Sequence, residues 1–291
     1  MDNNFKKVSR VLWIILFANL AVALVKILIG NLVKSASITA DGFHSLTDGA
    51  SNIVGLIGIS IASKPVDECH PYGHRKFETL AGLFIAAMLF IIGANIVIEG
   101  IDRIINPVLP DISFESIIML IGTILINIVI CTYEYNMGKK LKSQILISDS
   151  MHTRSDLFIS LGVLLTIVSI KLGLPHIVDP IASFVVSAFI FHSAYEIFKY
   201  NKDILVDRSV VDVDKVRDIA LSFEQVKGID NIRSRGSEED VYIDMHIMME
   251  SSLSVEKSHE LIHRIEERIR EDINKNVQLF THIEPYKPVD R

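Results

Sequence analysis

Six long apolar stretches fill the first 202 residues and constrain the fold of this chain more than any other feature. They cover residues 11–33, 36–62, 79–101, 113–133, 157–174 and 177–198. An α-helix needs about 20 apolar residues, within a range of about 17–25, to cross a bilayer. Each stretch meets that length, the fifth when its polar start is included, and the first lacks the cleavage site of a signal peptide. The sequence therefore predicts six transmembrane helices.

The composition changes sharply near residue 203. Residues 203–291 contain 20 acidic and 13 basic residues, a net charge of −7, whereas the first 202 residues carry a net charge of +1. The acidic part has no apolar run long enough to span a membrane. We therefore predict a transmembrane domain over residues 1–203 and a soluble domain over residues 204–291. An acidic surface argues against a nucleic-acid partner and favours attraction of cations.

The distribution of basic residues predicts the orientation in the membrane. Three segments on one side are rich in lysine and arginine: Lys6, Lys7 and Arg10; Lys64, Arg75 and Lys76; Lys139, Lys140 and Lys142. The segments on the other side have only Lys34, Arg103 and Lys171. The positive-inside rule then places both termini of this multi-pass cell-membrane protein in the cytoplasm. Cys69 and Cys131 are far apart in sequence, so no disulfide framework is expected there.

Two of the membrane helices carry the same polar pattern, H-x-x-x-D preceded by an aspartate three residues before the histidine. In the second stretch the residues are Asp41, His44 and Asp48, and in the segment that leads into the fifth they are Asp149, His152 and Asp156. At about 100° per residue, each set falls within about 60° on one helix face. An aspartate at mid-helix costs about 2.5–3.5 kcal/mol on insertion scales, so these acids must meet each other, water or a cation.

Two histidines and two aspartates from facing helices can form one four-coordinate site. We predict that His44, Asp48, His152 and Asp156 are its ligands, and that Asp41 and Asp149 assist through water or through contacts to the ligands. This set of two nitrogens and two oxygens suits a tetrahedral divalent cation, zinc first, whereas an all-carboxylate set would suit manganese better. Hydrogen bonds between helices, or hydration near the membrane surface, are the alternative explanation of the pattern.

A short loop and a predicted sheet hold further clusters of metal-ligating residue types. Asp67, Cys69, His70 and His74 lie within eight residues of each other, in the loop PVDECHPYGHRKFETLAG. In the soluble domain, residues 239–249 alternate between apolar and polar types, which places His246 on the face away from the core. His282 lies in a later strand, predicted over 277–283, and Glu284 directly after it continues the same face. With a helix over 212–223, a strand over 229–235 and a helix over 254–273, the order α-β-β-α-β predicts an α+β domain with both helices on one face of the sheet.

The helix 254–273 contains HELIH, a match to the zinc-protease motif H-E-x-x-H. Its predicted apolar face consists of Val255, Ile262, Ile265, Ile269 and Ile273. Around the helix axis His259 lies about 85° from the centre of that face and His263 about 125°, so His263 points to water and His259 lies at the boundary. Nothing buries Glu260 over a cleft, and a domain of this size leaves little room for one. We therefore do not expect a protease.

Taken together, the six helices, the paired H-x-x-x-D motifs, the histidine-containing loop and the small soluble domain resemble the cation diffusion facilitator family of metal transporters. The resemblance implies a ferredoxin-like cytoplasmic domain and a homodimer that exchanges Zn²⁺ or related ions for protons. It also implies a second metal site on Asp67, His70 and His74, and a pair between Lys76 and Asp207. For the cytoplasmic domain it implies a metal site on Asp230, His246, His259, His282 and Glu284, with Asp230 standing where members often have histidine.

The predicted function is proton-coupled efflux of a divalent metal, with Zn²⁺ expected and Fe²⁺, Cd²⁺ or Co²⁺ as alternatives. The metals would act as substrate and as regulatory ligands; protons, a second copy of the chain and the lipid bilayer are the other expected partners. The chain contains no G-x-x-x-x-G-K-[ST] motif, which argues against ATP as the energy source. A membrane-anchored metal sensor is the alternative from another class, but an anchor does not need polar stripes within the bilayer. No enzymatic activity is expected.

Overall fold

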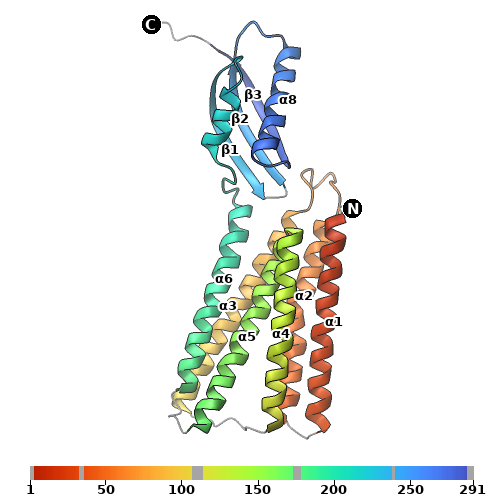
Figure 1. Ribbon diagram of the computed structural model, residues 1–291, viewed down its shortest axis with the longest axis vertical. Coiled ribbons are helices and arrows are strands. Elements are labelled where there is room, and N and C mark those ends of the chain that lie inside the picture. The colour runs from red at the N-terminus through yellow and green to blue at the C-terminus, as the bar shows by residue number, and fades with distance from the viewer. Residues whose placement is uncertain (1–2, 33–35, 107–113, 173–177, 238–239, 287–291) are drawn as a thin grey trace. The chain divides into compact units, whose positions relative to one another are not determined.

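The computed structural model describes residues 3–32, 36–106, 114–172, 178–237 and 240–286. The chain divides into two compact units, Met1–Lys202 and Asp203–Arg291, and each is described by itself (Figure 1).

The first unit consists of helices of 27 to 30 residues, in the part of the chain that the structure describes (Figure 1). They are α1 (Asn3–Leu32), α2 (Ala36–Ala62), α3 (Lys76–Ile105), α4 (Phe114–Leu141), α5 (Gln144–Lys171) and α6 (Val178–Leu205). Within the described residues, five of these helices are long and apolar enough to cross a membrane, and α2 contributes a shorter apolar segment, Gly49–Ala62. At about 1.5 Å per residue a helix of 28 residues is about 42 Å long, which exceeds the apolar thickness of a bilayer.

The helices extend well past the apolar stretches that predicted them. The fifth stretch begins at residue 157, but α5 begins at Gln144, so the polar segment with His152 is helical throughout. Similarly, α4 continues to Leu141, eight residues beyond the fourth stretch, and therefore includes Glu134. Hydrophobicity marks where a helix meets lipid, whereas its hydrogen bonds continue through polar residues that are covered by neighbouring helices.

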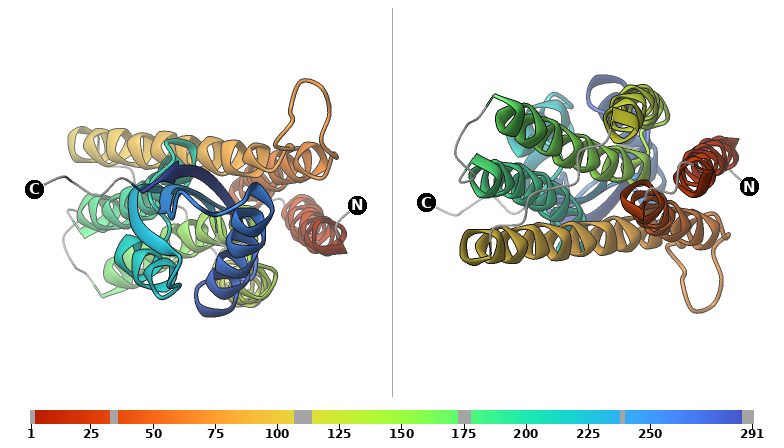
Figure 2. Two further views of the ribbon diagram at one scale, coloured as in Figure 1. Left: turned by 90° about the horizontal axis from the view of Figure 1, so that it is seen from above. Right: turned by 90° about the horizontal axis from the view of Figure 1, so that it is seen from below.

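Two apolar clusters hold the helices together, and the end-on views in Figure 2 show how these helices are arranged. The first joins α1, α2, α3, α4 and α5 and includes the buried Leu12, Ile59, Ile85, Ile130 and Ile145. The second joins α3 to α6, with α5 packed beside it. Close approach depends on small residues: a Cβ added to Gly58 of α2 would lie 2.5 Å from that of Ala81 on α3. Large apolar side chains such as Phe17, Leu28 and Ile91 are exposed, as expected for a surface in lipid.

The second unit is an α+β domain with the predicted element order. It contains α7 (Val213–Leu221), β1 (Val226–Ser237), β2 (Asp240–Met249), α8 (Val255–Asp272) and β3 (Val277–Pro285). The sheet order is β1-β2-β3, with β1 antiparallel and β3 parallel to β2. The side chains of Asp212 and Ser254 cap α7 and α8 by accepting backbone N–H groups of the first turns.

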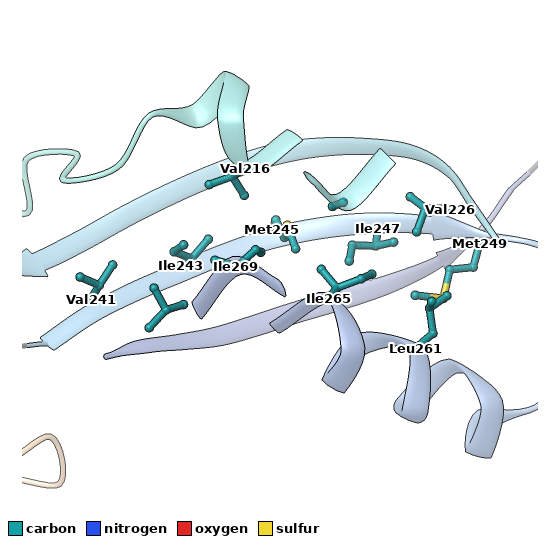
Figure 3. Packing of buried hydrophobic residues seen from close by; sticks show 12 residues of the cluster. Val216, Val226, Val241, Ile243, Met245, Ile247, Met249, Leu261, Ile265 and Ile269 are labelled. Carbon is teal, nitrogen blue, oxygen red and sulfur yellow. The ribbon is translucent and has the colours of Figure 1, made fainter. Parts of the chain in front are cut away.

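The core of this domain lies between the helices and one face of the sheet (Figure 3). Five alternate residues of β2, from Val241 to Met249, are buried against Val216 and Ala220 of α7 and against Leu261, Ile265 and Ile269 of α8. One part of the predicted apolar face of α8 was wrong: Val255 is 87% exposed, whereas Leu261 is 4% exposed. Val255 is the first residue of α8 and lies one turn before the buried stripe begins at Ser258. Among the described residues of this unit, no helix packs on the opposite face of the sheet.

Candidate metal-binding sites

The helices that carry the two H-x-x-x-D motifs, α2 and α5, contact each other and run in opposite chain directions (Figure 1). Nδ2 of Asn52 on α2 donates a buried hydrogen bond to Oδ2 of Asp149 on α5. Three residues further along α2, a Cβ added to Gly55 would lie 3.3 Å from Cγ1 of Ile145. These two contacts fix the register of the antiparallel helices.

That register brings the two motifs to the same depth. Both helices rise about 1.5 Å per residue, so a step back from Asn52 along α2 matches a step forward from Asp149 along α5. The backbone of Asp48 therefore lies at the level of His152 and Thr153, and that of His44 at the level of Asp156. The backbone of α2 is helical across these positions, while the side chains of Asp41, His44 and Asp48 lie outside the described residues.

On α5, the predicted ligand His152 is almost completely buried. It is 2% exposed, and neither Nδ1 nor Nε2 has a hydrogen-bond partner among the described residues. Asp156, one turn further along, is half-buried. A buried polar group without a partner costs about 1–3 kcal/mol. An imidazole nitrogen in this state is available to a cation, which is the chemistry expected of a ligand.

A buried polar network surrounds the contact between α2 and α5. Asp149 and Glu134 of α4 are both 0% exposed and lie beside each other. Oγ1 of Thr153 donates to Oε2 of Glu134 at 3.0 Å, and Nδ2 of Asn19 on α1 donates to Oδ1 of Asn52 at 3.0 Å. One oxygen of each acid, Oε1 of Glu134 and Oδ1 of Asp149, has no hydrogen-bond partner among the described residues.

The network links four helices, and three of its residues, Glu134, Asn19 and Thr153, belong to none of the sequence motifs. Asn52 is four residues after Asp48 and therefore lies on the same face of α2. Glu134 directly follows the fourth apolar stretch, so it resembles a residue at the membrane boundary. One feature of the sequence could have indicated that the helix continues past Glu134. The segment YEYNMGKKL is polar, long enough for two helical turns, and has basic residues near its end.

The loop between α2 and α3 brings its predicted ligands together. One ligand atom each of Asp67, His70 and His74 lies within 4.8 Å of the others. Nδ1 of His70 and Nε2 of His74 both lie 3.3 Å from oxygens of Asp67, and the two rings are 4.3 Å apart. His74 is 5% exposed, and its Nδ1 has no hydrogen-bond partner among the described residues. One carboxylate and two imidazoles fit a borderline cation such as Zn²⁺.

The electrostatics of this loop favour a charged aspartate. The backbone N–H of His70 donates to Oδ1 of Asp67 at 2.7 Å, and this bond holds the pKa of Asp67 below its ordinary value despite some desolvation. The carboxylate is therefore ready to accept a cation at neutral pH. Cys69 in the same loop is exposed and has a free thiol.

On the sheet face away from the helices, the cytoplasmic unit gathers four of its five predicted ligands. His246 pairs with Asp230 across β1 and with His282 across β3. Its Nδ1 lies 3.4 Å from Oδ1 of Asp230 and 3.2 Å from Oε1 of Glu284, and its ring centre is 5.0 Å from that of His282. Nε2 of His282 is 3.8 Å from the same Glu284 oxygen. The cluster combines two carboxylates with two imidazoles, which suits a divalent transition metal.

The fifth predicted ligand, His259, lies elsewhere. It sits on α8, the helix that packs on the opposite face of the sheet, and its Nε2 is 3.1 Å from Nε2 of His263. Within one chain the structure therefore does not bring His259 to the cluster on the open face. Glu260, the carboxylate of HELIH, is exposed, and so are both histidines.

Lys76 and Asp207 belong to the two different units. Lys76 is the first residue of α3, and Asp207 follows α6 in a turn with a φ of 55°. Their predicted pairing stays a prediction.

The fold is that of a multi-pass helical membrane protein, and each of its two units contains a cluster of metal-ligating residue types. A family model described as the cation efflux transmembrane domain matches residues 12–206, and one described as the cation efflux protein cytoplasmic domain matches residues 209–286. The chain therefore belongs to the cation efflux family, which confirms the resemblance. It is a divalent-cation transporter with a cytoplasmic C-terminal domain and not an enzyme.

Several curated relatives match most of the chain. An uncharacterized transporter of Methanocaldococcus jannaschii is 33% identical over 87% of this chain and 90% of the relative. The manganese efflux system proteins MneS and MneP of Bacillus subtilis are each 28% identical. MneS matches over 83% of this chain and 83% of its own length, and MneP over 98% and 99%.

Proposed function

We propose that this transporter carries a divalent transition metal on a site formed by His44, Asp48, His152 and Asp156. The observation that carries the proposal is the register set by the Asn52–Asp149 bond, because it places two sequence-distant motifs at one depth between antiparallel helices. The ring of His152 adds support, since a cation would satisfy a buried nitrogen that has no hydrogen-bond partner among the described residues. Asp41 and Asp149 would assist, Asp149 by its contact to α2 one turn away.

Zinc is the cargo that the donor set favours. Two imidazole nitrogens and two carboxylate oxygens are a common tetrahedral set for Zn²⁺. Manganese is the second candidate, because two relatives are named as manganese efflux proteins. Mn²⁺ accepts oxygen ligands readily, and Glu134 and Asp149 offer further carboxylate oxygens nearby.

Protons are the proposed counter-substrate. Imidazole and carboxylate must lose their protons before they bind a metal, so loading releases protons and protonation favours release. Efflux from the cytoplasm would then be driven by protons moving inward through the same residues. The basic loops support an orientation with both termini in the cytoplasm.

We further propose that the chain works as a homodimer and that the loop and sheet-face clusters bind regulatory metal. The cytoplasmic domain carries a net charge of −7, so two copies repel each other at close range. Metal on Asp230, His246, His282 and Glu284 would lower that repulsion and favour closure of the dimer.

Metal flux into proteoliposomes tests the transport proposal directly. Purified protein would be reconstituted with a pH gradient and offered Zn²⁺, Mn²⁺, Fe²⁺, Cd²⁺ and Co²⁺ separately. We expect zinc flux that rises with the gradient and disappears in His152→Ala. Asp102→Ala, a change at an exposed acid of α3, is the matched control and should transport normally. Zinc flux that does not change with the pH gradient would contradict proton exchange. Normal zinc flux in His152→Ala would contradict the proposed transport site.

A further inference from the structure

The HELIH segment of α8 holds a pair of exposed imidazoles that face each other. His259 and His263 are four residues apart, which places them on adjacent turns of one helix face. Their Nε2 atoms are 3.1 Å apart, and their rings are nearly perpendicular, with an interplanar angle of 83° and centres 4.5 Å apart. Two ring nitrogens of the same type therefore converge on one point above the helix.

A carboxylate lies near the other ring nitrogen of His263. Oε2 of Glu266, one turn further along, lies 3.7 Å from Nδ1 of His263. Glu266 is itself held in place, because its Oε1 accepts from Arg270 at 2.8 Å and from the backbone N–H of Leu279 at 3.1 Å. A carboxylate near Nδ1 favours the tautomer with its proton on that atom. The lone pair of His263 is then on Nε2, the atom that faces His259.

This pair is separate from the cluster on the sheet. Leu261, Ile265 and Ile269 of the same helix are buried against the sheet, so the pair lies on the outer side of α8. The cluster of His246, His282 and Glu284 occupies the other face of the sheet. In contrast to that cluster, the pair offers two nitrogens, and no carboxylate of the described residues forms a group of three possible ligands with it.

We propose that His259 and His263 chelate one divalent transition metal within a single subunit, with water at the remaining positions. Imidazole ligands favour the later first-row metals, in the order Mn²⁺ < Fe²⁺ < Co²⁺ < Ni²⁺ < Cu²⁺, with Zn²⁺ below Cu²⁺. The site would therefore bind Cu²⁺, Ni²⁺ and Zn²⁺ and discriminate against Mn²⁺. Because it lies on the cytoplasmic domain, this site would respond to cytoplasmic Cu²⁺, Ni²⁺ and Zn²⁺ independently of the membrane site. It would also occupy His259 and so compete with any use of this residue by a second subunit.

Copper binding to the full-length chain tests the chelate. The protein, without a histidine tag, would be titrated with Cu²⁺ in detergent and followed by electron paramagnetic resonance. It would carry His70→Ala, His74→Ala, His152→Ala, His246→Ala and His282→Ala, so that the other proposed metal sites do not bind copper. We expect one Cu²⁺ per chain with two-nitrogen character that His259→Ala and His263→Ala each remove. Loss of either ligand should weaken this site about a hundredfold, because the second nitrogen binds intramolecularly. The two changes together should also remove the weak binding by the single imidazole that either change alone leaves.

A matched variant keeps the number of histidines and changes only their spacing. His263→Ala with Arg264→His places the second ring five residues from His259, on a different side of the helix, and should bind as weakly as His263→Ala. Should an alanine variant lose its helical signal, His263→Gln takes its place. The proposal fails if His263→Ala binds copper like the parent, or if the respaced variant does. Metal flux is not part of the readout, so the outcome is independent of the transport proposal.

Discussion

The membrane unit and the cytoplasmic unit use the same residue types under opposite conditions of burial. In the membrane unit His152, Asp149 and Glu134 are 0–2% exposed and retain polar atoms without partners among the described residues. In the cytoplasmic unit the side chains of His246, His282 and Glu284 are 36–68% exposed, and water can satisfy them. A buried polar atom has a cost that only a proton, a metal or a hydrogen bond removes. Under the proposed function, this difference predicts that cations are required in the first unit and optional in the second.

The largest expected effect comes from removing a carboxylate of the membrane site. Asp48→Ala or Asp156→Ala should abolish zinc flux, because the remaining ligands cannot compensate the cation charge within the bilayer. The variants should still give a folded dimer in detergent by size-exclusion chromatography. Normal zinc flux in either variant would contradict the claim that the membrane site is required for transport.

Next in size is the loss of the bond that sets the register. Asn52→Ala leaves the buried Asp149 without its donor, which costs about 1–3 kcal/mol. Thermal unfolding in detergent should show a clearly lower midpoint. Asn19→Ala removes only the outer bond of the chain Asn19–Asn52–Asp149 and should cost about 0.5–1.5 kcal/mol. Equal losses in the two variants would show that Asp149 does not depend on Asn52.

A smaller change in transport is expected from the cytoplasmic cluster. His246→Ala with His282→Ala should weaken zinc binding by the domain and blunt the metal response, while part of the flux remains. Calorimetry of residues 203–291 expressed alone is the direct measurement. Zinc binding identical to that of the parent domain would remove the cluster and leave the domain as a dimerisation module.

The loop between α2 and α3 gives a prediction about pH. Because the pKa of Asp67 is lowered in the folded protein, the unfolded chain takes up this proton at a higher pH than the folded chain does. The contribution of Asp67 to stability is therefore complete at neutral pH and is lost only as the pH falls through the lowered value. Carbon-13 shifts of the Asp67 carboxyl, measured as a function of pH, should give a pKa below the usual aspartate value of about 3.9. Titration above that range would contradict the bond from the His70 backbone.

The smallest expected effect tests the protease motif. Glu260→Gln should leave flux and metal content unchanged, because Glu260 is exposed and has no assigned chemistry. Peptide cleavage by the purified protein that stops with this change would restore the protease interpretation.

The sequence predicted most of the architecture because its two periodicities are strong. The alternation in β2 placed His246 on the open face, and pairing across the sheet then brought it to His282 and Glu284. Prediction was weaker where polar residues continue a helix: the start of α5 at Gln144 and the burial of Glu134 depend on neighbouring helices. The prediction that Val255 belongs to the core was also wrong. Helix periodicity alone does not show where the sheet ends, and the sheet does not cover the first residue of α8.

Zinc coordination in the membrane unit tests the central claim, that α2 and α5 contribute jointly to one cation site. X-ray absorption would be measured on zinc-loaded protein in which the loop, sheet-face and α8 histidines are replaced, with Asp48→Ala and Asp156→Ala as comparisons. We predict one tightly bound Zn²⁺ per chain with two imidazole nitrogens and two oxygens at about 2.0–2.2 Å, and loss of that ion in either variant. Zinc that binds with one imidazole, or that persists when one helix loses its aspartate, would contradict a shared site.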